Sequence, residues 1–125
     1  MIEYKILEEQ GIVIVEPSGP LQKQDFENLT RDVDAYLEKH GEISGLIVHA
    51  KSFPGWENFG AFVSHITFLK DHHKKIKRVA VVTDSTFMSV APSIVKHFVS
   101  AQVKHFAYDE LDDAEKWVLA SYVHL

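Results

Sequence analysis

The sequence GLIVHAKSFPGWENFGAFVSHITFL, residues 45–69, reads in order as a buried strand, a sharp turn and an amphipathic helix. Residues 45–50 are apolar with little alternation, which is typical of a strand covered on both faces. The adjacent Pro54 and Gly55 then indicate a turn. After Asn58 the apolar residues recur at helical spacing, at Phe59, Phe62, Val63, Ile66 and Leu69. A strand that feeds a helix is half of a βαβ unit, so this stretch predicts a parallel sheet.

The residues before this stretch predict a hairpin and a helix. Residues 2–7 alternate apolar and polar, as a half-buried strand does, and residues 12–15 form a β-branched run. The short turn between them requires the two strands to be antiparallel. A helix is expected over residues 23–39, and Gly41 is expected to end it.

The residues after it continue the alternation of strand and helix. Residues 77–83 predict a buried strand, and residues 88–98 carry the apolar stripe of a helix that Pro92 kinks or starts. Residues 103–107 alternate and predict an edge strand. Asp112 resembles the N-cap of a final helix. The expected fold is α/β, in the order β-β-α-β-α-β-α-β-α: a mainly parallel sheet with an antiparallel N-terminal hairpin strand, forming a single domain over residues 1–125.

Composition narrows the function classes. The 125 residues include no cysteine, which excludes disulfides and thiolate metal sites. A net charge of −5 argues against general nucleic-acid binding. No stretch is apolar enough to span a bilayer, and the N-terminus lacks the pattern of a signal peptide. We therefore expect a cytoplasmic protein without a transmembrane segment.

Aromatic residues gather where the central strand ends. Four lie within ten residues, and Phe87 follows the next strand; the candidate binding residues are thus Phe53, Trp56, Phe59, Phe62 and Phe87. They line either an apolar pocket or a partner surface, or they pack as core. The helical stripe favours core packing for Phe59 and Phe62. Phe53 and Trp56 lie in a turn, where both interpretations stand.

His49 ends the central strand, where ligand-binding groups collect in α/β sheets, and we add it to the candidate binding residues. A half-buried histidine with satisfied hydrogen bonds is the plainer interpretation. An enzyme would need His49 to converge with Asp84. No nucleophile elbow, phosphate loop or metal-ligand spacing is present, so we expect no catalytic residue, no cofactor and no metal.

A basic run extends from Lys70 to Arg78. It could face a membrane or phosphate surface. Cations also collect at a helix C-terminus because the helix dipole favours them, and Asp71 interrupts the run. We therefore do not expect peripheral membrane contact through residues 70–78.

Four segments carry a resemblance to a known family: FPGWE at residues 53–57, FLKDHHKKIKRVAVV at 68–82, VKHF at 103–106 and LDDAEKW at 111–117. They resemble the SpoIIAA-like proteins of the STAS superfamily, small α/β domains named for sulfate transporters and anti-anti-sigma factors, and more narrowly the stand-alone bacterial branch. The resemblance covers nearly the whole second half of the chain.

This resemblance implies two kinds of function. Anti-anti-sigma members carry a phosphorylatable Ser in an Asp-Ser-Ser/Thr-Gly motif just after the central strand. Here the region reads HAKSFPG over residues 49–55, so Ser52 lies near the position of the phosphorylated Ser, but the preceding acid and the small-residue pattern of the motif are missing. Ser52 is the candidate phosphosite that the resemblance implies. The same branch is similar in shape to the lipid-binding CRAL-TRIO domains, which implies an apolar ligand.

We therefore expect a non-enzymatic binding module that holds a small apolar or amphipathic ligand, or a protein partner, at the carboxyl end of the sheet. The alternative is a regulatory interaction domain of the anti-anti-sigma type, switched by phosphorylation at Ser52 or Ser85. A homodimer is compatible with the half-exposed strand at residues 103–107 and with the surplus of aromatic residues.

Overall fold

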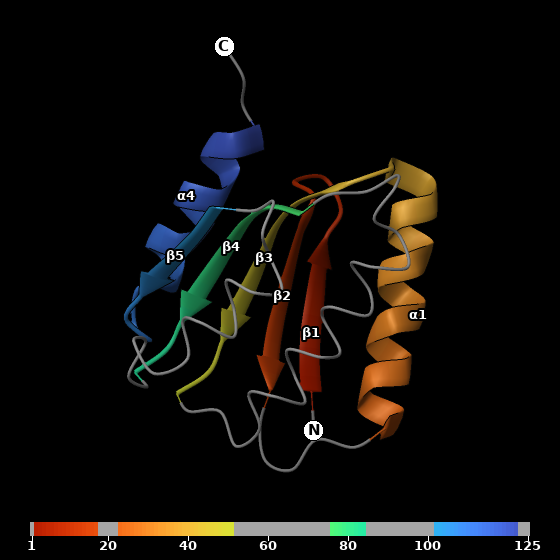
Figure 1. The fold of residues 1–125 in the computed structure, drawn as a ribbon, viewed down its shortest axis with the longest axis horizontal. Helices are drawn as coiled ribbons and strands as arrows, with labels where there is room; N and C mark the ends of the chain where they lie inside the picture. The colour runs from red at the N-terminus through yellow and green to blue at the C-terminus, as the bar shows by residue number, and fades with distance from the viewer. Residues whose placement is uncertain (1, 18–22, 52–75, 85–101, 123–125) are drawn as a thin grey trace.

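The computed structural model describes residues 2–17, 23–51, 76–84 and 102–122. In these ranges five strands form one mixed sheet in the order β1-β2-β3-β4-β5, accompanied by two helices (Figure 1). The strands are β1 (Ile2–Leu7), β2 (Ile12–Pro17), β3 (Ile43–His49), β4 (Ile76–Val82) and β5 (Gln102–Phe106). The helices are α1 (Lys23–His40) and α4 (Leu111–Tyr122). The helices predicted over residues 59–69 and 88–98 lie outside the described ranges.

The predicted fold class is confirmed. β1 and β2 form the antiparallel hairpin, and β2, β3, β4 and β5 then pair in parallel with their sequence neighbours. β5, predicted to be an edge strand, lies at one end of the sheet, and β1 lies at the other.

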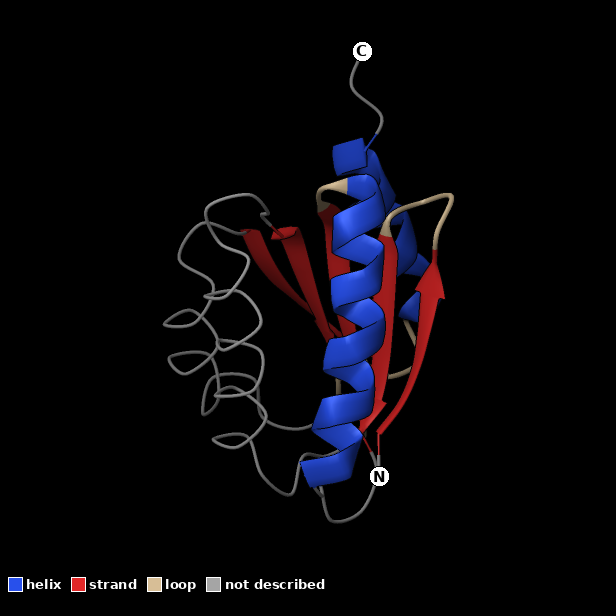
Figure 2. Ribbon diagram, turned by 90° about the vertical axis from the view of Figure 1, so that its right-hand side faces the viewer, coloured by secondary structure: helices blue, strands red, loops and turns tan. Residues whose placement is uncertain are grey.

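Successive strand residues point to opposite sides, so the buried strands give the sheet two apolar faces. One helix packs on each face. Figure 2 shows the two helices separated by the strands. On the α1 face the buried side chains are Val13, Val15, Leu46, Val48, Val79 and Val81, with Leu29, Val33 and Leu37 from the helix. On the α4 face they are Ile12, Ile14, Ile47, Ala80 and Val82, with Ala114 and Val118 from the helix. Burial on both sides explains the uninterrupted apolar runs of β2 and β3.

The ends of the helices follow local chemistry. Gly41 has φ of +88°, and its N–H donates to the Leu37 carbonyl at 2.8 Å, which confirms its predicted role in ending α1. The prediction that Asp112 caps α4 is wrong, because α4 already begins at Leu111. The Glu110 carbonyl accepts the Ala114 N–H at 3.1 Å, and the Glu110 carboxylate accepts the Ala107 N–H at 2.8 Å. Asp112 instead lies in the first turn, where the helix dipole favours its charge.

Gly45 allows α4 to approach β3 closely. A Cβ atom added at position 45 would overlap Val118 Cγ1 and would lie 3.0 Å from Val118 Cβ. Val118 itself is fully buried. The absence of a side chain at position 45 therefore sets the distance between α4 and the sheet.

Replacing Gly45 by Ala should destabilise the fold by about 1–3 kcal/mol, because the added methyl must displace Val118 or the helix. Val118→Ala removes the overlapping methyl, so the double variant should lose at least about 1 kcal/mol less than the sum of the two single variants. Urea unfolding of all four proteins measures this coupling.

Gly41→Ala is the matched control for this cycle. Among the residues that the structure describes, no atom lies within 4 Å of a Cβ placed at Gly41, so its cost of about 1 kcal/mol comes from backbone strain. That cost should add to the effect of Val118→Ala. If the effect of Gly45→Ala added to that of Val118→Ala as fully as the effect of Gly41→Ala does, the close packing of α4 on β3 would be contradicted.

Candidate functional site

The carboxyl ends of the parallel strands meet at one edge of the sheet, and His49 lies at the centre of a polar network there. His49 ends β3 and is about 10% exposed. Its Nδ1 lies 3.0 Å from Glu16 Oε2, near the end of β2. Its Nε2 lies 3.0 Å from the Tyr108 carbonyl oxygen, in the turn that follows β5. The ring also stacks on the Tyr108 ring, with centroids 4.3 Å apart. His49 thus connects β2, β3 and the turn that leads into α4.

The chemistry of these two contacts fixes one proton on the His49 ring. A backbone carbonyl only accepts hydrogen bonds, so Nε2 carries a hydrogen and donates it to Tyr108. The other ring nitrogen, Nδ1, faces the Glu16 carboxyl. Because the N–H bond occupies the lone pair of Nε2, this nitrogen is not available as a general base.

Asp84 holds the same turn from the other side. Its Oδ1 accepts the Tyr108 N–H at 3.2 Å. His49 and Asp84 therefore bind the carbonyl and the N–H of a single residue. In the described part of the chain, His49 and Asp84 make no hydrogen bond with each other.

Thr83 connects the ends of β3, β4 and β5. Its hydroxyl donates to the Lys51 carbonyl at 3.1 Å, and its N–H donates to the Phe106 carbonyl at 3.0 Å. The Thr83 carbonyl in turn accepts from His105 Nε2 at 2.9 Å. His49, Thr83, Asp84 and His105 thus hydrogen-bond main chain at the ends of the strands, and together they form a platform at this edge.

Of the predicted binding residues, His49 is the one that the structure describes. The others lie outside the described ranges: Phe53, Trp56, Phe59, Phe62 and Phe87, together with the phosphosite Ser52 and the alternative Ser85. Lys51, which directly precedes Ser52, is exposed, and its carbonyl is held by Thr83. The point at which the chain leaves the central strand is therefore fixed.

Two members of the basic run are described, and both have partners within the chain. Lys77 Nζ lies 3.4 Å from Glu42 Oε1. Arg78 donates to the Trp117 carbonyl at 2.6 Å, and its guanidinium lies 4.8 Å from the centre of the Trp117 ring. Arg78 thus fastens the middle of α4 to the start of β4.

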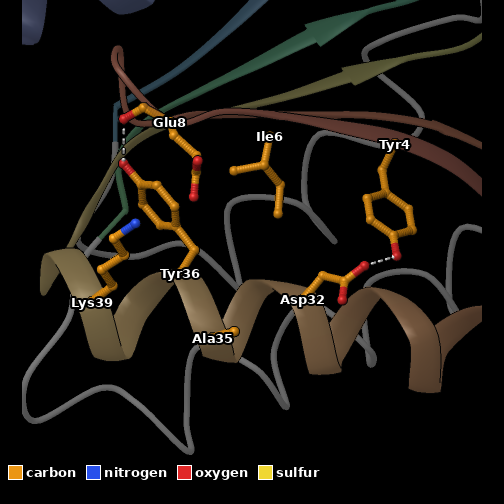
Figure 3. Close-up of a pocket in the computed structure, with 7 residues that line it drawn as sticks. All are labelled: Tyr4, Ile6, Glu8, Asp32, Ala35, Tyr36 and Lys39. Atoms are coloured by element: carbon orange, nitrogen blue, oxygen red, sulfur yellow. Dashed lines mark hydrogen bonds between the residues drawn. The ribbon is translucent and has the colours of Figure 1, made fainter.

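A second feature, which the sequence did not reveal, is a groove of about 410 Å³ between β1 and α1 (Figure 3). Its lining is formed by Tyr4, Ile6, Glu8, Asp32, Ala35, Tyr36 and Lys39. Figure 3 shows the side chains of Tyr4, Ile6 and Glu8 directed from the hairpin toward the helix.

Two tyrosines at the ends of the groove hold it in shape. The Tyr4 hydroxyl donates to Asp32 Oδ2, and the Tyr36 hydroxyl donates to the Glu8 carbonyl at 3.2 Å. Burial, followed by the hydrogen bond to Asp32, raises the pKa of Tyr4. The same hydrogen bond lowers the pKa of Asp32, so this carboxyl is ionised at neutral pH.

Replacing His49 by Ala should destabilise the protein by about 2–4 kcal/mol, because it leaves the Tyr108 carbonyl without its donor and opens a cavity. Amide hydrogen exchange should accelerate at residues 107–114 and stay unchanged in α1. The control is Gln102→Ala, in which an exposed side chain is removed from the start of β5. Unchanged exchange at residues 107–114 in His49→Ala would show that His49 does not hold the turn.

Replacing Tyr4 by Phe should reduce stability by about 1 kcal/mol or less, because Asp32 is partly exposed. A carboxyl whose folded pKa is lowered contributes stability above its unfolded pKa of about 4 and loses it as pH falls. A tyrosine whose folded pKa is raised contributes stability below about pH 10 and loses it as pH rises. The difference in unfolding free energy between the wild type and Tyr4→Phe should therefore be constant at intermediate pH and should fall at both low and high pH.

Urea unfolding across the pH range measures this difference, and Tyr36→Phe is the matched control on the acid side. The acceptor of Tyr36 is a backbone carbonyl, which does not titrate. The difference between wild type and Tyr36→Phe should therefore stay constant between about pH 6 and pH 3. A Tyr4→Phe difference that also stays constant there would contradict the link to Asp32.

The family model described as SpoIIAA-like matches residues 12–119. Searches of curated proteins and of solved structures found no match. No helix in the described ranges is long and apolar enough to cross a membrane. The matched region begins at β2, includes the carboxyl-edge network and ends within α4, which agrees with the resemblance drawn from the sequence. The chain therefore belongs to the SpoIIAA-like family.

Proposed function

We propose that this protein is a non-enzymatic binding module, and that it holds a small apolar or amphipathic ligand or a protein partner at the carboxyl edge of its sheet. The proposal rests on which groups the polar side chains at this edge bind. His49, Thr83 and Asp84 all hydrogen-bond main chain, and the Nε2 of His49 has no lone pair to accept a proton. The side chains at the carboxyl edge therefore support a binding surface and do not activate a nucleophile.

The position of the aromatic residues supports the binding role. Phe53 and Trp56 follow Lys51 in the sequence, and Thr83 fixes the Lys51 carbonyl to the end of β4. In parallel sheets, ligands bind outside the carboxyl ends of the strands. An apolar segment that starts from this fixed point suits a ligand or partner with apolar surface.

A regulatory role of the anti-anti-sigma type is the second candidate, and two observations favour it. The chain belongs to the SpoIIAA-like family, and Ser52 follows the anchored Lys51 directly. A phosphate on Ser52 would add negative charge beside the platform and alter how a protein partner docks there.

Native mass spectrometry of the protein purified from its host tests both candidates in one experiment. A bound apolar ligand adds mass that disappears on denaturation. A protein partner adds a discrete complex. Phosphorylation adds the mass of one phosphate, which survives denaturation and should map to Ser52.

The Trp56→Ala variant should lose the bound ligand or partner, whereas Trp117→Phe, on the helix packed against the sheet, should retain it. An unliganded mass without a partner from every preparation would overturn the binding proposal. A bound species that persists equally in Trp56→Ala would show that binding occurs elsewhere.

A further inference from the structure

The outer edge of β1 has no strand beside it among the described residues, because β1 is the first strand in the order of the sheet. Its six residues pair with β2 on the inner side. An edge of this length presents a row of backbone N–H and C=O groups that another strand can pair with.

The register of the hairpin identifies which backbone groups face outward. Ile2 lies opposite Pro17, and proline has no N–H to exchange, so this is a non-hydrogen-bonded pair. Such pairs alternate with hydrogen-bonded pairs along an antiparallel ladder. The even-numbered residues of β1, which include Tyr4 at its centre, therefore direct their N–H and C=O away from β2.

The charges on this edge are arranged symmetrically about Tyr4. Glu3 and Lys5 flank Tyr4, lie on the sheet face opposite α1 and are both exposed. When two copies of β1 pair antiparallel about Tyr4, Glu3 of each copy lies opposite Lys5 of the other. These two pairs fall at non-hydrogen-bonded positions, where opposed side chains approach most closely.

We propose that β1 pairs with β1 of a second copy of this chain, in a two-fold symmetric dimer that joins the two sheets into one. The partner is a second copy because the edge is complementary to itself in both backbone and charge. A two-fold interface requires this property, since the same patch contributes both halves.

The groove beside β1 supports the same arrangement. On the α1 side of the sheet, the added strand would place its Tyr4 beside Tyr4 of the first copy and direct it toward the space between β1 and α1. That space is the groove of about 410 Å³ (Figure 3). Side chains of the second copy that enter it would bury apolar surface that a lone subunit leaves open.

The other edge of the sheet lacks this complementarity. β5 carries Lys104 as its middle residue, and Lys104 is exposed. Antiparallel pairing of two β5 strands about their centre would place Lys104 opposite Lys104. An exposed lysine in that position protects an edge from pairing, so the dimer is assigned to β1 and not to β5.

Charge reversal tests the proposal through sedimentation equilibrium of the full chain. The wild type should be a dimer. Glu3→Lys places lysine opposite lysine, and Lys5→Glu places glutamate opposite glutamate, so each variant alone should weaken the dimer at least about tenfold. An equimolar mixture of the two variants restores both opposite-charge pairs and should form a heterodimer. The double variant Glu3→Lys/Lys5→Glu should form a homodimer again.

Matched controls separate this interface from a general effect of charge. Asp113→Lys and Lys116→Glu make the same kinds of charge change at exposed positions of α4, which packs on β3, β4 and β5 and not on β1, and they should leave the dimer intact. Far-UV circular dichroism checks that each variant is folded, and recovery in the mixture excludes misfolding as the cause of dissociation. A monomeric wild type, or a dimer that neither single reversal weakens, would overturn the proposal.

Discussion

The ring of His49 is the constraint on which the carboxyl edge depends. It joins Glu16, which is 33 residues earlier in the chain, to Tyr108, which is 59 residues later. Through these contacts the end of β2, the end of β3 and the turn before α4 are held together. Asp84 binds the same turn through the Tyr108 N–H, so the start of α4 is fixed from both β3 and β4.

The packing of α4 follows from that anchored start. Once the turn is fixed, the helix passes over the sheet with Val118 against the bare backbone of Gly45, and Arg78 binds its middle from β4. A side chain at position 45 would push the helix off the sheet. The His49 contacts and the absence of a Cβ at Gly45 therefore act on the two ends of the same docking surface.

The sheet offers two kinds of surface, and they differ in chemistry. At the carboxyl edge, polar side chains are hydrogen-bonded to main chain, and they hold the points from which the following segments leave the strands. At β1, outward-directed backbone groups and the exposed Glu3 and Lys5 lie at an edge of the described sheet, beside a groove that Tyr4 and Tyr36 bridge with hydrogen bonds. The proposed ligand or partner site and the proposed dimer interface are thus separate, and each can fail without the other.

Much of the fold was predictable because its signals are local. The runs at residues 12–15 and 45–50 predicted buried strands, the turn between the first two strands predicted the hairpin, and Gly41 ended α1 as expected. The network at the carboxyl edge was not predictable, because Glu16 and Tyr108 meet His49 across long separations. Glu16 carries a partial signal, because it lies near the end of β2, and the carboxyl ends of β2 and β3 meet at the same edge of the sheet.

The groove had no local signal, because half-buried residues of two separate elements form it. The start of α4 lies two residues before the predicted one, because Glu110 and not Asp112 precedes the first helical residue. The Glu110 carbonyl accepts the first i→i−4 hydrogen bond of the helix, and its carboxylate accepts the Ala107 N–H, whereas the sequence around Asp112 resembles a side-chain cap. Helix ends depend on a few such contacts and not on the periodicity that identifies the helix.

The most direct test of this account is the protonation state of the His49 ring, measured by long-range ¹H–¹⁵N correlation NMR at neutral pH. The contact with the Tyr108 carbonyl predicts that Nε2 carries a hydrogen, and that this remains so whether Nδ1 is protonated or not. A ring with an unprotonated Nε2 would contradict the account. It would mean that His49 does not hold the turn and that its lone pair is available for acid–base chemistry at the carboxyl edge.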